Sequence, residues 1–281
     1  MKMYSSIRDP SDVVHRWVFD FELILFNEKN LLLIENFMYN WWWLSIPFVL
    51  FYIIIIYIGQ IWMRKRNKKF ELRKVLIIWN VFLAVFSFCG ACRCVPELLY
   101  SLNKHGFYHS LCNPILKKGV TGLWLWLFII SKVPETIDTL FIVLRRQQLI
   151  FLHWFHHASV LVYCFYSYGL FAPIGRWFTS MNLCVHTIMY SYFALRAARF
   201  RVPRFIQQSI TILQVIQMFI GCIVNTVAYK YKQDGYYCMT SNSNIIVSLV
   251  LYIIYLILFA HFFYLSYLQK GMNKSMKERT D

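Results

Sequence analysis

The chain has 281 residues, of which 59% are hydrophobic and 15% are charged, and its formal net charge at pH 7 is +16. Charged residues make up about a quarter of an ordinary soluble domain, so this composition argues against a soluble enzyme and indicates a membrane protein. The basic residues cluster between apolar runs, so membrane topology explains the positive charge better than nucleic-acid binding does, and we expect no nucleic-acid partner.

Apolar segments dominate the chain after its first forty residues, which are polar and mixed in charge and resemble no cleavable signal peptide. Each segment is close to the roughly 20 residues that cross a bilayer as a helix. The segments are 41–62, 75–98, 121–143, 149–168, 177–195, 207–229 and 245–268. We therefore predict an all-α polytopic membrane protein with one domain, 1–281, and seven transmembrane helices in 41–268.

The distribution of basic residues sets the expected orientation. The connection 64–74 is the most basic, and placing it in the cytosol also places there Arg145, Arg146, the arginines of 196–204 and the tail 269–281. Because basic connections stay cytoplasmic, we expect a luminal N-terminal segment, 1–40, and a cytoplasmic C-terminus.

Two of the eight cysteines, Cys112 and Cys238, fall in connections that this orientation places in the lumen. The lumen of the endoplasmic reticulum is oxidising, whereas a cysteine inside a span usually acts as a small apolar residue. We predict a disulfide between Cys112 and Cys238.

Polar side chains recur at helical spacing in four consecutive spans, where such groups are costly and mark function. They are Lys132, Glu135 and Asp138 in the third span, His153, His156 and His157 in the fourth, Asn182, His186 and Tyr190 in the fifth, and Gln214 and Gln217 in the sixth. The third-span residues also fit a structural ion-pair ladder, and the glutamines fit simple bonding between helices. One closed cavity that all four spans line accounts for every stripe at once.

Three functions fit such a cavity to different degrees. The histidines resemble one box of a di-iron lipid desaturase or hydroxylase, but those enzymes need about eight histidines in three boxes, so we expect no metal. A transporter needs a path through both faces, and no repeated halves support one. Acyl transfer fits better, because a neutral imidazole attacks a thioester and forms a reactive acyl-imidazole.

Four motifs, in their order and spacing, resemble those of one known family. They are Lys132-Val-Pro-Glu135-Thr-Ile-Asp138, His153-x-x-His156-His157, His186-x-x-Met189-Tyr190 and Gln214-x-x-Gln217. The chain resembles the eukaryotic very-long-chain fatty acid elongase family over roughly residues 35–268. One departure is Phe193, where that family commonly has a tyrosine.

The resemblance implies a very-long-chain 3-oxoacyl-CoA synthase, an acyltransferase of the endoplasmic reticulum membrane. Such an enzyme condenses a long-chain acyl-CoA with malonyl-CoA to 3-ketoacyl-CoA, CO2 and CoA, the first and rate-setting step of microsomal fatty acid elongation. Six helices are expected to form an inverted barrel around an acyl tunnel, with the first helix outside. The family mechanism places the nucleophile at His156 and needs no bound cofactor beyond the two CoA substrates.

The other site residues receive expected roles from the same resemblance and from local chemistry. His153 and His157 are alternative candidates for the base, and His186 supports them from the fifth span. Glu135 and Asp138 are expected to orient imidazoles, and Lys132 to balance their charge or reach a CoA phosphate. Asn182, Tyr190, Gln214 and Gln217 complete the cavity wall. Arg145, Arg146, Arg196 and Arg199 are candidates for CoA binding, although the orientation rule also explains them.

Substrate and partners follow from the resemblance alone. Trp154 inside the histidine motif resembles the branch that acts on saturated and monounsaturated chains near C16. Expected partners are membrane lipid, a ketoreductase, a dehydratase and an enoyl reductase, together with a second copy of the chain in a homodimer. Lys277 and Arg279 resemble a degenerate retrieval signal.

Overall fold

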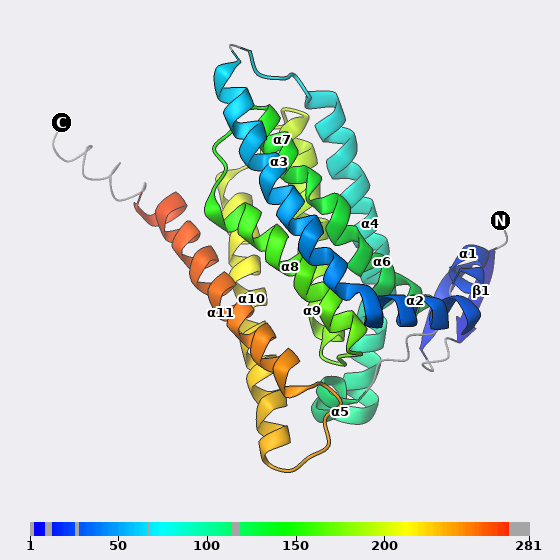
Figure 1. Cartoon of the computed structure of the whole chain (residues 1–281). Coiled ribbons are helices and arrows are strands. Elements are labelled where there is room, and N and C mark those ends of the chain that lie inside the picture. Colours follow the sequence, from blue (N-terminus) through cyan, green and yellow to red (C-terminus); the bar gives the residue numbers. More distant parts are fainter. Residues whose placement is uncertain (1–2, 9–12, 26–27, 67, 114–118, 270–281) are drawn as a thin grey trace.

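The computed structural model describes residues 3–8, 13–25, 28–66, 68–113 and 119–269, so the retrieval motif at Lys277 and Arg279 lies outside the described residues. A bundle of helices makes up most of this part of the chain (Figure 1). Its helices are α2 (Glu28–Trp41), α3 (Ser45–Lys65), α4 (Arg73–Tyr100), α5 (Gly106–Cys112), α6 (Gly119–Glu135), α7 (Ile137–Leu144), α8 (Phe151–Gly169), α9 (Gly175–Ala197), α10 (Arg204–Gln233) and α11 (Asn242–Phe263). Short 3₁₀ or π turns cover Trp42–Leu44, Ser101–His105 and Tyr264–Gln269.

A helix lies over each predicted apolar segment, with the third segment divided between α6 and α7. Within the described ranges, four helical runs are long and apolar enough to cross a membrane: Lys29–Lys65, Arg73–Cys112, Arg204–Gln233 and Asn242–Gln269. Helices α6 to α9 do not meet this criterion of length and apolar character. A break separates α6 from α7 and shortens both, and α8 and α9 carry polar stripes. The chain is therefore a helical membrane protein, and three of its four motifs lie on the helices that fall short of this criterion.

The N-terminal segment departs from the all-α prediction. Strands β1 (Met3–Arg8) and β2 (Val14–Phe19) pair antiparallel, with Met3 opposite Phe19, and a short helix, α1 (Asp20–Ile24), follows. The sequence prediction missed this hairpin because it relied on apolar spans, which a short two-stranded ribbon does not contain. The hairpin lies beside the bundle near the N-terminal end of α2 (Figure 1).

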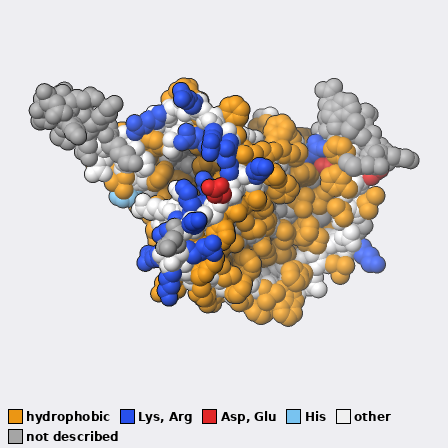
Figure 2. Space-filling model, turned by 90° about the horizontal axis from the view of Figure 1, so that it is seen from above, with side chains coloured by type: hydrophobic (Ala, Val, Ile, Leu, Met, Phe, Trp, Pro, Cys, Tyr) orange, Lys and Arg blue, Asp and Glu red, His pale blue; other side chains and the backbone are white. Residues whose placement is uncertain are grey.

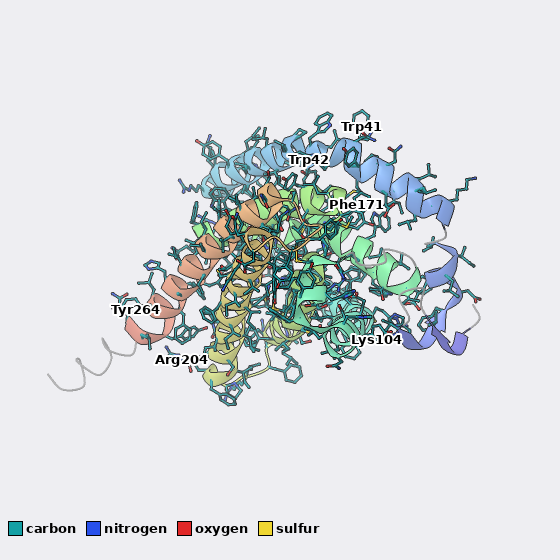
Figure 3. All side chains as sticks on the ribbon, turned by 90° about the horizontal axis from the view of Figure 1, so that it is seen from below. Trp41, Trp42, Lys104, Phe171, Arg204 and Tyr264 are labelled. Atoms are coloured by element: carbon teal, nitrogen blue, oxygen red, sulfur yellow. A yellow bond between two sulfur atoms is a disulfide. The ribbon has the colours of Figure 1, made fainter. Side chains whose placement is uncertain are left out.

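Neighbouring helices in the bundle pack in a definite order. Helix α4 packs against α6 and, most extensively, against α9; α6 packs against α8, α8 against α11, α11 against α10, and α10 against α9. Helix α3 packs on α7 and α8 (Figure 1). Seen from below, the labelled Arg204 and Tyr264 lie on one side of the molecule (Figure 3), where Arg204 donates to the carbonyl of Ser266.

Two local features of the sequence explain how these helices pack. Pro134 lacks the N–H that an α-helix needs, and the helix breaks at Thr136, between α6 and α7. Between α10 and α11, a Cβ at Gly221 would lie 2.1 Å from the ring of Tyr252, so the two helices can approach this closely only with glycine at that position. The break lets α6 and α7 present their polar residues in different directions.

A buried ion pair joins α1 to the bundle. Arg93 Nε lies 2.9 Å from Glu22 Oε1, and Trp124 Nε1 donates to the same oxygen at 2.7 Å. Burial by itself raises the pKa of the Glu22 carboxyl, but the hydrogen bonds from Arg93, the Phe19 amide and Trp124 outweigh it and hold the pKa below its usual value. The carboxylate therefore stays ionised and contributes stability at neutral pH, which is lost as the pH falls through the lowered pKa.

The structure joins Cys112, at the end of α5, to Cys238, between α10 and α11, in a disulfide, which is the pairing expected from the sequence. The bridge spans 126 residues of sequence. Both cysteines are buried in a cluster with Ile174 and Tyr252. The bridge thus holds the α10–α11 connection against the rest of the bundle.

Replacing Cys112 by serine is expected to lower the free energy of unfolding by about 2–5 kcal/mol, because the unfolded chain regains the freedom of a long loop. The measurement is unfolding of the detergent-solubilised protein with and without reductant. Cys92→Ser, at an exposed free thiol, is the matched control. A wild-type transition that reductant leaves unchanged would contradict the role of the bridge.

Candidate active site

A cavity of about 520 Å³ lies among α4, α7, α8, α9, α10 and α11. Most of the residues that the sequence predicts for the site line it. They are Asp138, Arg145, His153, His156, His157, Asn182, His186, Tyr190, Arg196, Gln214 and Gln217. The four polar stripes therefore meet around one space. The lining of the cavity does not include Lys132, Glu135, Arg146 or Arg199.

The three histidines of α8 form one wall of the cavity. The His153 and His157 ring centroids are 4.6 Å apart, and those of His156 and His157 are 5.7 Å apart. The His156 ring also lies 4.9 Å from the ring of Tyr255 and 6.1 Å from that of Phe259, both on α11. Within the described part of the chain, no hydrogen bond engages the ring nitrogens of His156 or His157. The lone pair of a neutral His156 is therefore available to a substrate in the cavity.

Lys132 and Glu135 form a buried ion pair behind the cavity wall. Lys132 Nζ lies 2.8 Å from Glu135 Oε1 and 3.1 Å from Asn182 Oδ1, and it sits 4.2 Å from the centroid of the Phe128 ring. Lys132 is 2% exposed. The expectation that Lys132 reaches a CoA phosphate is therefore wrong, and its contacts are those of a charge-balancing residue.

This ion pair sets the orientation of the next two residues. Because Asn182 Oδ1 accepts from Lys132, its amide nitrogen must be the atom that lies 3.2 Å from His186 Nε2. That nitrogen donates, so His186 Nε2 is the acceptor and the ring proton is on Nδ1. His186 Nδ1 lies 3.9 Å from Glu135 Oε2, on the side where a carboxylate favours an N–H. Glu135 thus faces the His186 imidazole.

Asp138 has different partners from those that the sequence predicts. Trp79 Nε1 donates to Asp138 Oδ1 at 2.6 Å, and the Tyr190 hydroxyl donates to Oδ2 at 2.8 Å. The expectation that Asp138 orients an imidazole directly is wrong, because its two carboxylate oxygens accept from Trp79 and Tyr190. Asp138 instead holds Tyr190, whose ring packs edge-on against His186 at 5.3 Å.

Several residues of the site lie outside every motif. Trp79 on α4 and Tyr255 on α11 are aromatic residues in strongly apolar helices, where no polar stripe marks them. Tyr52 on α3 bonds Thr139, which in turn lies 3.1 Å from His153 Nε2. The sequence carries no signal for these residues beyond a hydroxyl or an indole in an apolar run.

Basic side chains gather on the end of the bundle shown in Figure 2. The connections α3–α4, α7–α8 and α9–α10 meet there: Arg73 donates to the Ala197 carbonyl and Arg146 donates to the Arg66 carbonyl. Of the four arginines proposed for CoA, Arg145 and Arg196 line the cavity. Arg146 is instead engaged with the α3–α4 connection.

Trp154 does not face the cavity. It is half-buried against a cluster that includes Val49 and Tyr52 of α3, and its ring packs edge-on against Phe151 at 5.2 Å. Any link between Trp154 and acyl preference therefore rests on resemblance and not on contact with a substrate.

Comparison with known proteins adds a family assignment to this geometry. Residues 37–275 match the family model described as ELO: GNS1/SUR4 family. The chain is 46% identical over 267 residues to very long chain fatty acid elongase 6 of Drosophila melanogaster, covering 94% of this chain and 83% of that protein. It is 44% identical to very long chain fatty acid elongase 6 of Homo sapiens, over 90% of this chain and 93% of that protein. It is 39% identical to very long chain fatty acid elongase 3 of Homo sapiens, over 85% of this chain and 88% of that protein.

Proposed function

The chain belongs to the ELO (GNS1/SUR4) family and is a fatty acid elongase that condenses an acyl-CoA with malonyl-CoA, and from this premise we propose that His156 carries the acyl group between two half-reactions. One observation carries the assignment: His156 lines the cavity beside two further imidazoles and has no hydrogen bond to its ring among the described residues. A nucleophile needs such a free lone pair.

In the first half-reaction, a ring nitrogen of His156 attacks the thioester carbonyl of the acyl-CoA. The new N–C bond forms as the C–S bond breaks, and the CoA sulfur leaves as a thiolate. The remaining imidazole proton passes through a neighbouring imidazole to the thiolate, so that CoA leaves as the thiol. Tyr255 and Phe259 shield the acyl-imidazole from water.

In the second half-reaction, malonyl-CoA loses CO2 as its C–C bond breaks. The resulting enolate carbon attacks the acyl-imidazole carbonyl. The new C–C bond forms as the N–C bond to His156 breaks, and the released ring nitrogen takes up one proton from solvent, which restores neutral His156. The enolate oxygen needs a donor while its charge develops. His186 lines the cavity with a fixed ring, because Asn182 donates to its Nε2 and its Nδ1 proton lies toward Glu135, and this ring positions the malonyl group for the second half-reaction.

The two ends of the substrate fit different parts of the molecule. Arg145 and Arg196 line the cavity near the basic end of the bundle, and guanidinium groups suit the phosphates of CoA. A second cavity, of about 70 Å³, lies deeper, among apolar residues such as Phe128, Ile129 and Phe178. We propose that CoA lies at the basic end and that the acyl chain points toward the deeper apolar residues.

We propose that α4 and α6 to α11 form an inverted barrel of six transmembrane helices, with α6 and α7 counted as one and α3 packed outside. The packing of the helices supports this arrangement, because the contacts run in a closed ring from α4 through α6, α8, α11, α10 and α9 back to α4. The basic end would face the cytosol, with the N-terminus in the lumen of the endoplasmic reticulum and the C-terminus in the cytosol. The whole chain then forms one membrane-embedded domain.

The decisive experiment supplies the purified protein with malonyl-CoA and acyl-CoA substrates of graded length and unsaturation. We expect 3-ketoacyl-CoA, with the highest kcat/KM for saturated and monounsaturated chains near C16. A ketoreductase, a dehydratase and an enoyl reductase must then consume this product, because a 3-keto group has to be reduced before another cycle begins. Formation of no condensation product from any acyl-CoA would overturn the proposal, and a maximum with polyunsaturated chains would overturn the substrate assignment.

A further inference from the structure

A chain of hydroxyl groups connects α3 to the histidine wall. Tyr52 is 5% exposed, and its hydroxyl lies 2.7 Å from Thr139 Oγ1. Thr139 is fully buried, and its hydroxyl lies 3.1 Å from His153 Nε2. Tyr52 and Thr139 lie behind the cavity wall, whereas His153 lines it. Three elements, α3, α7 and α8, therefore share one hydrogen-bonded path that ends on a residue of the site.

Counting hydrogens fixes the direction of this path. Each hydroxyl has one hydrogen to donate. In the described part of the chain, Thr139 is the hydrogen-bond partner of the Tyr52 hydroxyl, so the buried phenol satisfies its hydrogen by donating to Thr139. The hydrogen of Thr139 then points to His153 Nε2, which must carry the lone pair. The opposite direction leaves the Tyr52 hydrogen without an acceptor at a buried position, which is unfavourable.

We propose that Tyr52 and Thr139 are positioning residues that hold His153 neutral with its proton on Nδ1. His153 then acts as a hydrogen-bond donor to a substrate oxygen in the cavity and not as a base. The natural acceptor is the carbonyl oxygen of the acyl group, which gains negative charge when His156 attacks. This inference rests on the proposed function and assigns one of its open roles.

The same geometry assigns the remaining histidine. The His157 ring lies beside both His153 and His156. No hydrogen bond from the described residues engages it, so it keeps a lone pair for a proton. His157 is therefore the base that takes the proton of the acylated His156 ring and returns it to the CoA thiolate, and no net proton is gained or lost.

Measuring the tautomer of His153 tests this inference directly. Nitrogen-15 NMR of histidine-labelled protein separates protonated from unprotonated ring nitrogens, and His153→Gln identifies the His153 signals. We expect Nδ1–H and a bare Nε2 in the wild type, and a change of tautomer in Thr139→Val. An Nε2–H tautomer in the wild type would overturn the inference, whether or not the protein elongates acyl chains.

Kinetics of Tyr52→Phe provide the second test, because this variant keeps the ring that packs on α8 and removes only the hydroxyl. We expect kcat to fall roughly 10–100-fold, as for other residues that orient a reacting group, with KM for the acyl-CoA unchanged. Tyr57→Phe, at a 64% exposed position of the same helix, is the matched control. Equal kcat values for the two variants would refute the positioning role, whereas an inactive wild type would refute the proposed function instead.

Discussion

Replacing His156 by alanine is expected to abolish both half-reactions. Removing a covalent nucleophile from an enzyme that acts through a group of cooperating residues costs roughly 10⁴–10⁶ in kcat. The cavity retains His153, His157 and His186 in this variant, so the loss reports the covalent step and not the disappearance of the site. The measurement is the intact mass after incubation with palmitoyl-CoA alone, followed by the yield of 3-ketoacyl-CoA once malonyl-CoA is added.

The matched control for this variant is His261→Ala, which removes an exposed imidazole on α11 that does not line the cavity. We expect this control to acylate and condense like the wild type. An acyl adduct that persists in His156→Ala would move the nucleophile to another residue. An adduct that forms in His186→Ala without subsequent condensation would agree with the role given to His186 in the second half-reaction.

Replacing Glu135 by alanine is expected to lower the free energy of unfolding by about 3–5 kcal/mol, because it leaves the Lys132 ammonium uncompensated in the protein interior. Lys132 is 2% exposed and Glu135 is 4% exposed, so water cannot replace the lost partner. Thermal unfolding of the solubilised protein measures the effect. A transition like that of the wild type would contradict a buried charge at Lys132.

The double variant Lys132→Met, Glu135→Leu separates stability from activity. Apolar residues of similar size often replace a buried ion pair without loss of stability, so we expect the transition to recover most of the difference. Activity should stay low, because Asn182 no longer has a cation to accept from and is free to turn its amide away from His186. Full recovery of kcat would show that the ion pair only holds the helices together.

The positions of the helices and the composition of the site are predictable from the sequence. Apolar runs of about twenty residues indicate spans whatever the rest of the fold, because the bilayer sets their length. Polar stripes at helical spacing in four such runs point to a shared cavity, since an isolated polar face at membrane depth is costly. The same reasoning fits His153, His156, His157, Asn182 and His186, all of which line the cavity.

The pairings inside the site are not predictable in this way. Helical spacing says which residues share a face, but not how far each helix is rotated about its axis or which neighbour its face meets. Asp138 lies one turn beyond Glu135 and yet bonds Trp79 and Tyr190, because the break at Thr136 redirects α7. Lys132, which the sequence also allows at the CoA end, is instead buried behind the cavity wall, where it pairs with Glu135.

The sequence by itself determines that this chain crosses a membrane, places a histidine face in an apolar helix and carries the motifs of an acyl-condensing family. The tertiary structure alone decides which partners the ring nitrogens of His153 and His186 meet. That choice depends on single hydrogen bonds between residues far apart in the chain, such as Lys132 to Asn182 and Tyr52 to Thr139. Hydrogen bonds are directional and act over about 3 Å, so only the packed helices define them.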